Sequence, residues 1–331
     1  MRGIFVRKSK LMIISLIGIS IIFGGTFYSM GQNMNKAGII EKELGDDEVT
    51  FGYGQGLQVV TSNSTNEDKM NGVLRLDSSE DTLDIIFENF NDESVYVMKL
   101  LYDLKEIEFQ IVGETEYVSE YRFKTKDNIQ NIIPIKLPKN IQADNKSHNL
   151  IVSFFSSPET YEKDVQYQTN SYGISLDHQL TYTDKIEAFH LALNEYEYNE
   201  KELDLEFSGL MLNQDFTDYE LVKFPESVIT SNRNEKVTLA YRAGRLEEFP
   251  ERYAIVMYVD WEQQQIDKRP YKLIQMEDPE KIGYGTFSFT APSEKGFYEI
   301  VANIIPDPNT EHSSENFFPL ENSYRFTLEV K

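Results

Sequence analysis

Residues 106–111 read Glu-Ile-Glu-Phe-Gln-Ile, and this strict alternation of polar and apolar side chains decides the fold class. Successive side chains of a strand point to opposite faces, so a period of two is typical of a strand with one buried face. Similar runs occur at 83–87, 237–239, 287–289 and 326–330. Turn-forming stretches separate them, such as Asn91-Asp92-Glu93 and Ser293-Glu294-Lys295-Gly296. The sequence therefore predicts an all-β body.

The two halves of this body contain the same series of parts. Each half has a strand that ends at a proline, then an apolar strand, a proline-bearing loop and a final strand. In the first half these parts are 135–138, 150–155, 158–160 and 171–176; in the second they are 288–292, 299–302, 308–310 and 323–328. A proline at the end of a strand stops pairing because it lacks the backbone donor. The repeat predicts two tandem β-sandwich domains, at 49–184 and 185–331.

The second half resembles an immunoglobulin-like or fibronectin-type sandwich. Seven strands are expected there, near 225–230, 236–242, 252–261, 270–276, 283–290, 296–305 and 322–330. The Gly-Phe-Tyr-Glu-Ile strand at 296–300, which follows Ala291-Pro292-Ser293, is similar to the closing half of many bacterial immunoglobulin-like domains. This resemblance covers about the last hundred residues and implies a fold only. Trp261 ends an apolar strand, and we expect it to pack in the core.

The N-terminus predicts a membrane anchor. Four basic residues precede an uncharged run, Leu11 to Met30, that is rich in Ile and Leu. About 20 apolar residues at 1.5 Å rise each match the ~30 Å hydrocarbon core of a bilayer. Basic residues stay on the cytoplasmic side, so 1–10 is expected to be a cytoplasmic tail, 11–30 a transmembrane signal-anchor helix and 31–48 an extracytoplasmic tether.

A cleaved signal peptide is the alternative interpretation of the same run. Ser29-Met30-Gly31 offers small residues for a cut before Gln32, although no Ala-x-Ala sequence is present. An uncleaved helix predicts a single-pass membrane protein with its body outside the cell membrane. Cleavage near Gly31 predicts a secreted protein.

Composition narrows the partners of the exported body. The whole chain has a net charge of −23, and removing the four basic residues before the apolar run takes it to −27. We do not expect this acidic body to bind nucleic acid, because such binding depends on Lys and Arg side chains that neutralise phosphate. Cysteine is absent, which removes thiol nucleophiles, Cys-ligated zinc and disulfides. This composition resembles that of exported proteins from AT-rich Gram-positive bacteria.

Catalytic signatures are missing. The four histidines, His148, His178, His190 and His312, are widely separated, and no Gly-x-Ser-x-Gly elbow or phosphate-binding glycine loop occurs. The sequence therefore predicts no catalytic residue, no cofactor and no enzyme. An envelope hydrolase, with a His-carboxylate pocket assembled in space, is the least favoured alternative.

An oxygen-rich loop at 307–316 is a candidate calcium site. Calcium takes six to eight oxygen ligands in flexible geometry. The candidate ligands are Asp307, Asn309, Glu311 and Glu315. The loop does not match the Asp-x-Asp-x-Asp-Gly pattern, and a solvated hairpin loop is the preferred interpretation.

An acidic stretch at 195–206 is a candidate docking face for a cationic partner. Its candidate contact residues are Tyr196, Tyr198, Glu200, Glu202, Asp204 and Glu206. The preferred interpretation is structural, because acidic side chains on an outer strand keep a sheet edge from pairing with another chain.

Together these observations predict a non-catalytic, membrane-anchored interaction or assembly module of a cell envelope. Its expected partners are the membrane, through the N-terminal helix, and an envelope protein. The alternative is a secreted or anchored module that binds glycan or Ca²⁺, with Tyr161, Tyr167, Tyr196 and Tyr198 as candidate glycan contacts.

Overall fold

The computed structural model describes residues 39–44, 54–78, 81–90, 92–139, 141, 144, 146–158, 161, 173–182, 193, 195–202, 208–215, 228–313, 318 and 320–331. This part of the chain forms 23 strands and one five-residue helix, which confirms the all-β prediction. The predicted membrane segment, 11–30, lies outside the described residues. Within them, no helix has the length and apolar character needed to span a membrane.

The first half of the chain forms two sheets. Outer sheet 1 has the order β2-β4-β10-β7-β8, with β1 also paired to β10, and inner sheet 1 has the order β3-β12-β11-β5-β6, with β9 also paired to β5. The outer strands are β1 (Ile40–Glu43), β2 (Gln55–Val60), β4 (Thr82–Asn89), β7 (Phe109–Ile111), β8 (Tyr117–Val118) and β10 (Ile129–Lys136). The inner strands are β3 (Val73–Arg75), β5 (Ser94–Tyr102), β6 (Lys105–Glu106), β9 (Tyr121–Thr125), β11 (Ser147–Ser156) and β12 (Gly173–Thr181). A buried apolar cluster packs between the two sheets and makes them the first sandwich.

The second half forms another two sheets. Outer sheet 2 has the order β13-β20-β16-β14, and inner sheet 2 has the order β15-β23-β21-β17-β18, with β19 paired to β17 and β22 paired to β21. The outer strands are β13 (Glu200–Glu202), β14 (Gly209–Asn213), β16 (Lys236–Gly244) and β20 (Lys281–Thr290). The inner strands are β15 (Val228–Ser231), β17 (Arg252–Val259), β18 (Glu262–Gln263), β19 (Lys272–Gln275), β21 (Gly296–Pro306), β22 (Glu321–Asn322) and β23 (Phe326–Val330). They enclose a core of their own and form the second sandwich.

The two sandwiches share one topology, as the sequence repeat predicts. Inner sheet 1 and inner sheet 2 have matching strand orders, and the three-strand series β2-β4-β10 matches β14-β16-β20. In each inner sheet the first strand pairs in parallel with the last, β3 with β12 and β15 with β23. The other ladders between named strands are antiparallel. Structurally equivalent residues can therefore be assigned across the repeat: Leu101 pairs with Ile151 as Tyr258 pairs with Val301.

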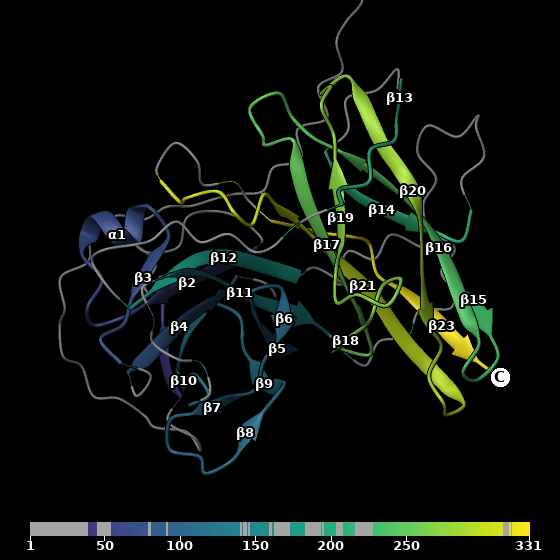
Figure 1. Cartoon of the computed structure of the whole chain (residues 1–331). Coiled ribbons are helices and arrows are strands. Elements are labelled where there is room, and N and C mark those ends of the chain that lie inside the picture. Colours follow the sequence, from purple (N-terminus) through teal and green to yellow (C-terminus); the bar gives the residue numbers. More distant parts are fainter. Residues whose placement is uncertain are drawn as a thin grey trace, which may run out of the picture.

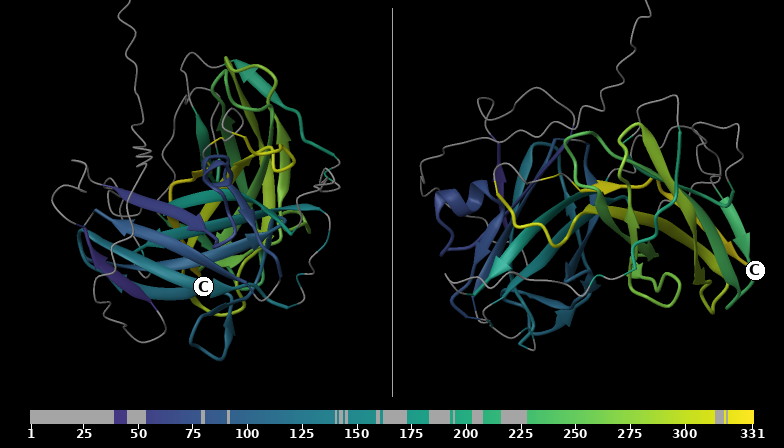
Figure 2. Two further views of the ribbon diagram at one scale, coloured as in Figure 1. Left: turned by 90° about the vertical axis from the view of Figure 1, so that its left-hand side faces the viewer. Right: turned by 45° about the horizontal axis from the view of Figure 1, so that its top comes forward.

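The molecule is a stack of four sheets. The two sandwiches lie side by side, the first purple to teal and the second from the teal of β13 and β14 through green to yellow, in Figure 1 and in the right-hand view of Figure 2. A third apolar cluster joins the two inner sheets. Strand β11 is consequently buried at all of its positions, on both faces. This explains why residues 150–155 are apolar on both faces except for Ser153, because a strand with two buried faces needs no alternation.

The stretch that predicts the fold, 106–111, contributes residues to two sheets. Phe109 and Ile111 lie in β7 of outer sheet 1 and face the core, as the alternation predicts. Glu106 ends β6 of inner sheet 1. The chain therefore crosses from one sheet to the other at residues 107–108, where Ile107 packs against the core between them.

The body also begins earlier than predicted. Strand β1 falls within the predicted tether, 31–48, and pairs with β10 from Ile40↔Ile132 to Glu43↔Ile129. Ile39 is buried in the core of the first sandwich. The fold therefore begins by residue 39, which leaves 31–38 as the longest link to a helix ending at residue 30.

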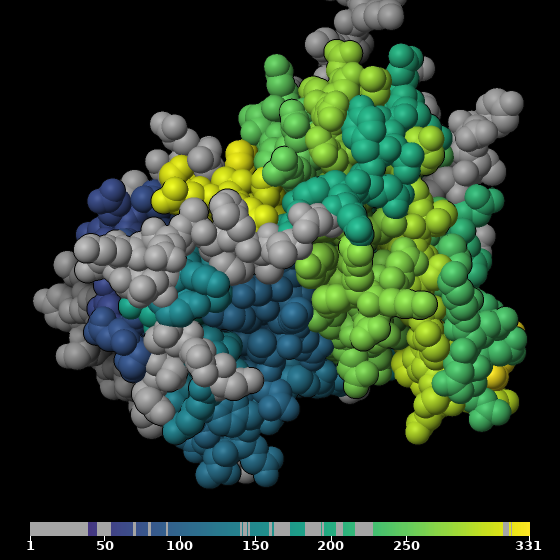
Figure 3. Space-filling model, in the orientation of Figure 1, coloured from purple at the N-terminus to yellow at the C-terminus, as the bar shows by residue number. Residues whose placement is uncertain are grey.

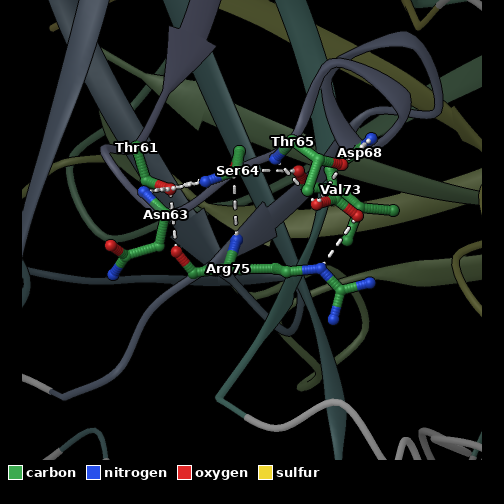
Figure 4. Close-up of polar contacts among 7 residues, drawn as sticks. All are labelled: Thr61, Asn63, Ser64, Thr65, Asp68, Val73 and Arg75. Carbon is green, nitrogen blue, oxygen red and sulfur yellow. Dashed lines mark hydrogen bonds and ion pairs between the residues drawn. The ribbon is translucent and has the colours of Figure 1, made fainter.

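Helix α1 (Asn66–Met70) is fixed by a polar network at one end of the first sandwich (Figure 4). The Thr65 hydroxyl accepts from the backbone N–H of Asp68, and the Asp68 carboxylate accepts from the N–H of Thr65 in return. This reciprocal pair is a capping box, which satisfies N–H groups that the first helical turn leaves without a partner. Arg75 Nε lies 2.8 Å from Asp68 Oδ1 and ties the helix to β3. The turn between α1 and β3 is thereby held in place.

Candidate functional site

The junction between the two inner sheets is the most elaborate site in the described part of the chain. It is built around two equivalent hairpins, β5-β6 and β17-β18. Both turn residues of each hairpin have positive φ: Asp103 and Leu104 in the first, Asp260 and Trp261 in the second. This conformation is typical of two-residue hairpin turns but costs a side-chain-bearing residue roughly 1–2 kcal/mol. The contacts of Leu104 and Trp261, both fully buried in the junction, must offset that cost.

The two hairpins contact each other reciprocally. The backbone N–H of Glu106 donates to Gln263 Oε1 at 2.7 Å, and the backbone N–H of Gln263 donates to Glu106 Oε2 at 2.8 Å. These residues are equivalent, because Glu106 pairs with Leu101 as Gln263 pairs with Tyr258. The fully buried ammonium of Lys99 lies 2.6 Å from Glu106 Oε1 and neutralises its charge. The junction therefore resembles the interface of a symmetric dimer within one chain.

Apolar side chains from both inner sheets fill the junction. They are Val97, Leu101, Leu104, Ile151 and Phe155 of the first sandwich, and Ala254, Val256, Tyr258, Trp261, Leu273, Val301, Ile305 and Leu320 of the second. Phe155 lies with its ring centroid 5.1 Å from that of Trp261 and 5.7 Å from that of Tyr258. A buried apolar contact of this kind holds two domains in one orientation, since relative motion would expose it to water.

A buried cation fixes the edge of the junction. Arg325 Nε lies 2.9 Å from Glu299 Oε2, and both side chains are almost fully buried. The remaining guanidinium nitrogens of Arg325 donate to the carbonyl oxygens of Ser156 and Ser157 in the first sandwich. The guanidinium carbon also lies 4.9 Å from the centroid of Trp261, whose indole N–H donates to the carbonyl of Pro158. One side chain of the second sandwich thus satisfies backbone groups of the first.

The calcium candidates lie in a segment that crosses between the sandwiches. The Asp307 carboxylate accepts from the backbone N–H of Asn309, and the backbone N–H of His312 donates to Gln179 of β12. Glu311 is exposed, and Glu315 lies outside the described residues. Among the residues that the structure describes, no group of three or more His, Asp or Glu side chains has the arrangement of a metal site. Neither interpretation from sequence anticipated that this loop packs on the other sandwich.

We expect millimolar Ca²⁺ to leave the melting temperature of the full chain unchanged. An ion that binds only the folded state raises stability with its concentration, so a bound calcium would shift the thermal transition upward. Scanning calorimetry with Ca²⁺, and with Mg²⁺ as the ionic-strength control, makes the measurement. A calcium-specific upward shift that Asp307→Asn abolishes would instead establish the candidate site.

The docking candidates differ in how far their side chains are buried or bonded within the fold. Tyr196 packs against the junction, where burial raises its pKa to about 12. Glu200 Oε1 accepts the backbone N–H groups of Glu277 and Asp278, so this carboxylate is used within the fold. Tyr198 is 51 % exposed and donates to Glu200 Oε2.

Of the remaining docking candidates, Glu202 is exposed at the end of edge strand β13. Asp204 and Glu206 lie outside the described residues. Within the described part, Tyr198 and Glu202 are therefore the candidates that stay at the surface.

A cavity of about 260 Å³ lies beside this stretch. Its charged side chains are paired across it: Arg269 lies 2.5 Å from Glu195, and Lys272 lies 2.5 Å from Glu197. Tyr241 donates to the same Glu197 carboxylate. These pairs link the stretch 195–197 to inner sheet 2. Asp267, which also lines the cavity 3.6 Å from Lys272, leaves the lining with one excess negative charge.

One of the candidate glycan contacts, Tyr161, is also constrained. The Tyr161 hydroxyl donates to Asp260 Oδ1 at 3.4 Å, and its ring lies 6.3 Å from Phe297. Tyr161 therefore belongs to the rim of the junction. Tyr167 lies outside the described residues.

The described histidines form two separate groups with carboxylates. His148 Nδ1 lies 2.9 Å from Asp103 and its Nε2 lies 3.1 Å from Asp144. Burial lowers the pKa of His148, but these two carboxylates outweigh it and raise the pKa above its usual value. With both ring nitrogens bonded to carboxylates, neither is placed to take a proton from a nucleophile.

The second histidine group lies at the junction. His312 Nε2 lies 3.4 Å from Asp177, and His178 is next to Asp177 in β12. His190 lies outside the described residues. His312 of the second half is thus brought to Asp177 of the first, while His178 contacts the Gly72 carbonyl on the opposite face of β12.

The sequence interpretation missed the junction itself. It treats each sandwich as an independent unit, although two signals point to a contact. One is the run at 150–155, which is apolar except for Ser153, and the other is the run Ala254-Ile255-Val256-Met257-Tyr258-Val259 in the second half. A sandwich strand with one buried face should alternate, so these runs indicate burial on both faces.

Comparisons with known proteins place few constraints on the chain. No family model matches it, and no curated protein is significantly similar. Among solved structures, the C-terminal domain of the Streptococcus agalactiae AgI/II polypeptide BspA is 10 % identical, with 83 % of this chain and 100 % of that one covered and a TM-score of 0.23. The C-terminal domain of the Streptococcus pyogenes antigen I/II-family protein AspA is 10 % identical over 84 % and 99 % of the two chains, with a TM-score of 0.22. The E. coli chaperone DraB is 9 % identical over 83 % and 98 %, with a TM-score of 0.26. At these scores the architecture rests on the strand pairing alone.

Proposed function

We propose that this chain is a non-catalytic interaction or assembly module, anchored in the membrane of a Gram-positive cell envelope by a helix at 11–30. Its two sandwiches act as tandem immunoglobulin-like domains, 49–184 and 185–331, with β1 added to the first. They lie outside the membrane and bind an envelope protein.

The observation that supports the proposal is the junction. Reciprocal hairpin bonds, a shared apolar cluster and the Arg325 contacts hold the outer sheets in one fixed arrangement. A binding surface that is already rigid loses less conformational entropy when a partner docks. The described polar groups that sequence analysis singled out are mostly bonded within the fold, as in Glu200 and His148.

The position of β1 adds a second argument. If the membrane helix ends at residue 30, the link 31–38 lets residue 39 lie at most about 30 Å from the end of the helix. The first sandwich is then held close to the membrane surface, because β1 is already part of outer sheet 1. Such an arrangement suits a partner that is itself in or near the membrane.

Reversible cross-linking in native envelopes followed by affinity capture tests the proposal. The bait is the full chain with a tag after Lys331, which is exposed. The control joins residues 1–38 to an unrelated acidic domain. We expect specific envelope proteins on the full chain and not on the control, and weaker capture by Arg325→Ala, which loosens the junction. Capture no greater than the control would contradict the proposal.

Sequencing of the mature N-terminus tests the anchor separately. An intact Met1 in the membrane fraction is the expected result. A start at Gln32 with the protein in the medium would establish the secreted alternative. The interaction role would then belong to a released protein.

A further inference from the structure

The cavity of about 260 Å³ lies at one edge of the second sandwich, between the β18–β19 connection and the segment 195–197. This segment runs beside β19, where the backbone N–H of Glu197 donates to the carbonyl of Leu273. Figure 3 shows the teal residues of the 195–202 segment lying across the green part of the second sandwich. Sites for small molecules typically measure about 300–1,000 Å³, so this cavity has room for one long side chain rather than for a cofactor.

The floor of the cavity is a charge pair that is fixed by the sandwich core. Lys272 Nζ lies 2.5 Å from Glu197 Oε2, and the Lys272 side chain is only 12 % exposed. Glu197 Oε1 accepts from the hydroxyl of Tyr241, which belongs to the core. Gly285 of β20 leaves the space that this carboxylate occupies, since a Cβ there would collide with Glu197 Oε1. Glu197 and Lys272 are therefore held in place, and their charges cancel.

The rim of the cavity carries the excess negative charge. Arg269 pairs with Glu195, and both side chains are more than half exposed. Asp267 Oδ1 accepts from the backbone N–H of Ser288 at 3.0 Å, whereas its Oδ2 lies 3.6 Å from Lys272 Nζ, which is too far for a hydrogen bond. Among the described residues, none donates a hydrogen bond to Asp267 Oδ2. One carboxylate oxygen at the cavity is thus left to accept from a ligand.

A tight turn positions this carboxylate. Ile266 and Arg269 exchange both of their backbone hydrogen bonds, and Asp267 and Lys268 between them have φ values of 50° and 70°. This is the geometry of a two-residue hairpin turn with positive φ at both positions. The bond from Ser288 also ties the turn to β20. An acceptor that is already positioned loses less conformational entropy when a ligand binds.

We propose that this cavity binds a guanidinium side chain of the partner protein, with Asp267 Oδ2 and the exposed carboxylate of Glu195 as acceptors. The inference rests on the proposed interaction role and names the chemistry of the contact. The lining has three carboxylates and two cations, so one added positive charge makes it neutral. The net charge of −23 on the chain also attracts a cationic partner and speeds its association.

A guanidinium suits the cavity better than an ammonium does. Its planar fork of N–H groups can donate to two carboxylates at once, whereas an ammonium is a compact point charge. Its plane can also pack on an aromatic ring, and Tyr271 lines the cavity. We therefore expect the site to prefer arginine to lysine.

An NMR titration of the full chain in micelles of an uncharged detergent tests the site. The probe is N-acetyl-arginine amide, and the comparison is N-acetyl-citrulline amide, which has nearly the same shape but no charge. We expect the arginine probe to shift the backbone N–H signals of Glu197, Asp267 and Leu273 saturably, with an affinity about tenfold above that of the citrulline probe. Equal affinities of the two probes, or shifts confined to other residues, would overturn the proposal.

Asp267→Asn removes the excess charge and keeps the turn, since the amide oxygen can still accept from the N–H of Ser288. We expect this variant to bind the arginine probe about fivefold more weakly, as for a half-exposed charge pair. Asp278→Asn is the matched control, because Asp278 also accepts a backbone N–H and lies beside a lysine, Lys281, but does not line the cavity.

Glu195→Gln covers the case in which Asp267→Asn does not fold, because Glu195 is 73 % exposed and its replacement leaves the core intact. We expect it to weaken binding of the arginine probe about threefold. An affinity that neither cavity variant changes, or an equal loss in Asp278→Asn, would contradict the assignment.

Affinity capture from native envelopes separates this inference from the proposed function. Asp267→Asn should retain less of the partner than Asp278→Asn does. Equal capture by the two variants would overturn the assignment of the cavity and leave the interaction role standing. Binding of the arginine probe without capture of any envelope protein would contradict the interaction role, while the preference of the cavity for a guanidinium would stand.

Discussion

Replacing Arg325 by Ala is expected to uncouple the two sandwiches and to lower the free energy of unfolding by about 3–5 kcal/mol. The substitution leaves the Glu299 carboxylate buried without its cation, and the carbonyls of Ser156 and Ser157 lose their donor. Removing one partner of a buried ion pair costs far more than removing a surface pair, because the charge that remains cannot be hydrated. Urea denaturation, followed by intrinsic fluorescence and by circular dichroism, measures the effect. We expect one transition in the wild type to become two in the variant.

The control is Lys124→Ala. Lys124 lies on β9 and forms an exposed ion pair with Glu93, so its removal should leave the free energy of unfolding unchanged within error. The double variant Arg325→Met, Glu299→Leu removes both charges together and should recover much of the lost stability. A single, unshifted transition for Arg325→Ala would show that the junction does not couple the sandwiches.

Trp261 gives the second large effect. Trp261→Ala is expected to cost about 3–5 kcal/mol, because it empties a buried site against Phe155 and removes the stacking surface of Arg325. The backbone of Trp261 has φ = 71°, a conformation that glycine adopts without strain and alanine does not. Trp261→Gly should therefore be less harmful than Trp261→Ala by about 1 kcal/mol, the reverse of the usual order. Equilibrium unfolding of both variants measures the difference.

Leu104 provides the matched test, since it occupies the equivalent turn position with φ = 63°. Leu104→Gly should also be milder than Leu104→Ala. If alanine were better tolerated than glycine at both positions, the paired hairpin turns would not have the described conformation.

Local pattern predicts the strands of this protein well. Six of the segments expected in the second half overlap strands β16, β17, β19, β20, β21 and β23, because each of these has the composition and spacing of a strand between turns. The expected strand at 225–230 overlaps β15, which begins at Val228. Short strands such as β18 were missed, since two residues in a hairpin carry no periodic signal.

The local alternation of polar and apolar residues could not predict contacts between distant parts of the chain. Trp261 was expected in a sandwich core on the face of Ile255 and Met257, but it lies in the junction, on the side opposite to them. The turn at Asp260-Trp261 directs the side chain of Trp261 into the junction. Its positive φ values could not be predicted, because the sequence has no glycine there. His312 and Asp177 likewise belong to segments with no local relationship, so their pairing depends on the tertiary fold.

The acidic stretch shows a similar limit. Composition grouped Tyr196, Tyr198 and Glu200 as one surface, yet the backbone around Glu197 pairs with Leu273 and Gln275 of β19 and turns these side chains in different directions. Tyr196 is directed into the junction, while Tyr198 stays exposed. Alternation along one strand cannot predict this, because the segment leaves one sheet before it joins another as β13.

A single distance tests most directly the claim that the two sandwiches form one rigid body. The chain has no cysteine, so cysteines placed at Glu43 of β1 and Lys236 of β16, both exposed, can be spin-labelled without background. Pulsed electron spin resonance on the full chain near neutral pH should give one narrow distance distribution, and Arg325→Ala should broaden it. A broad or bimodal distribution in the wild type would contradict the rigid junction on which the proposed function depends.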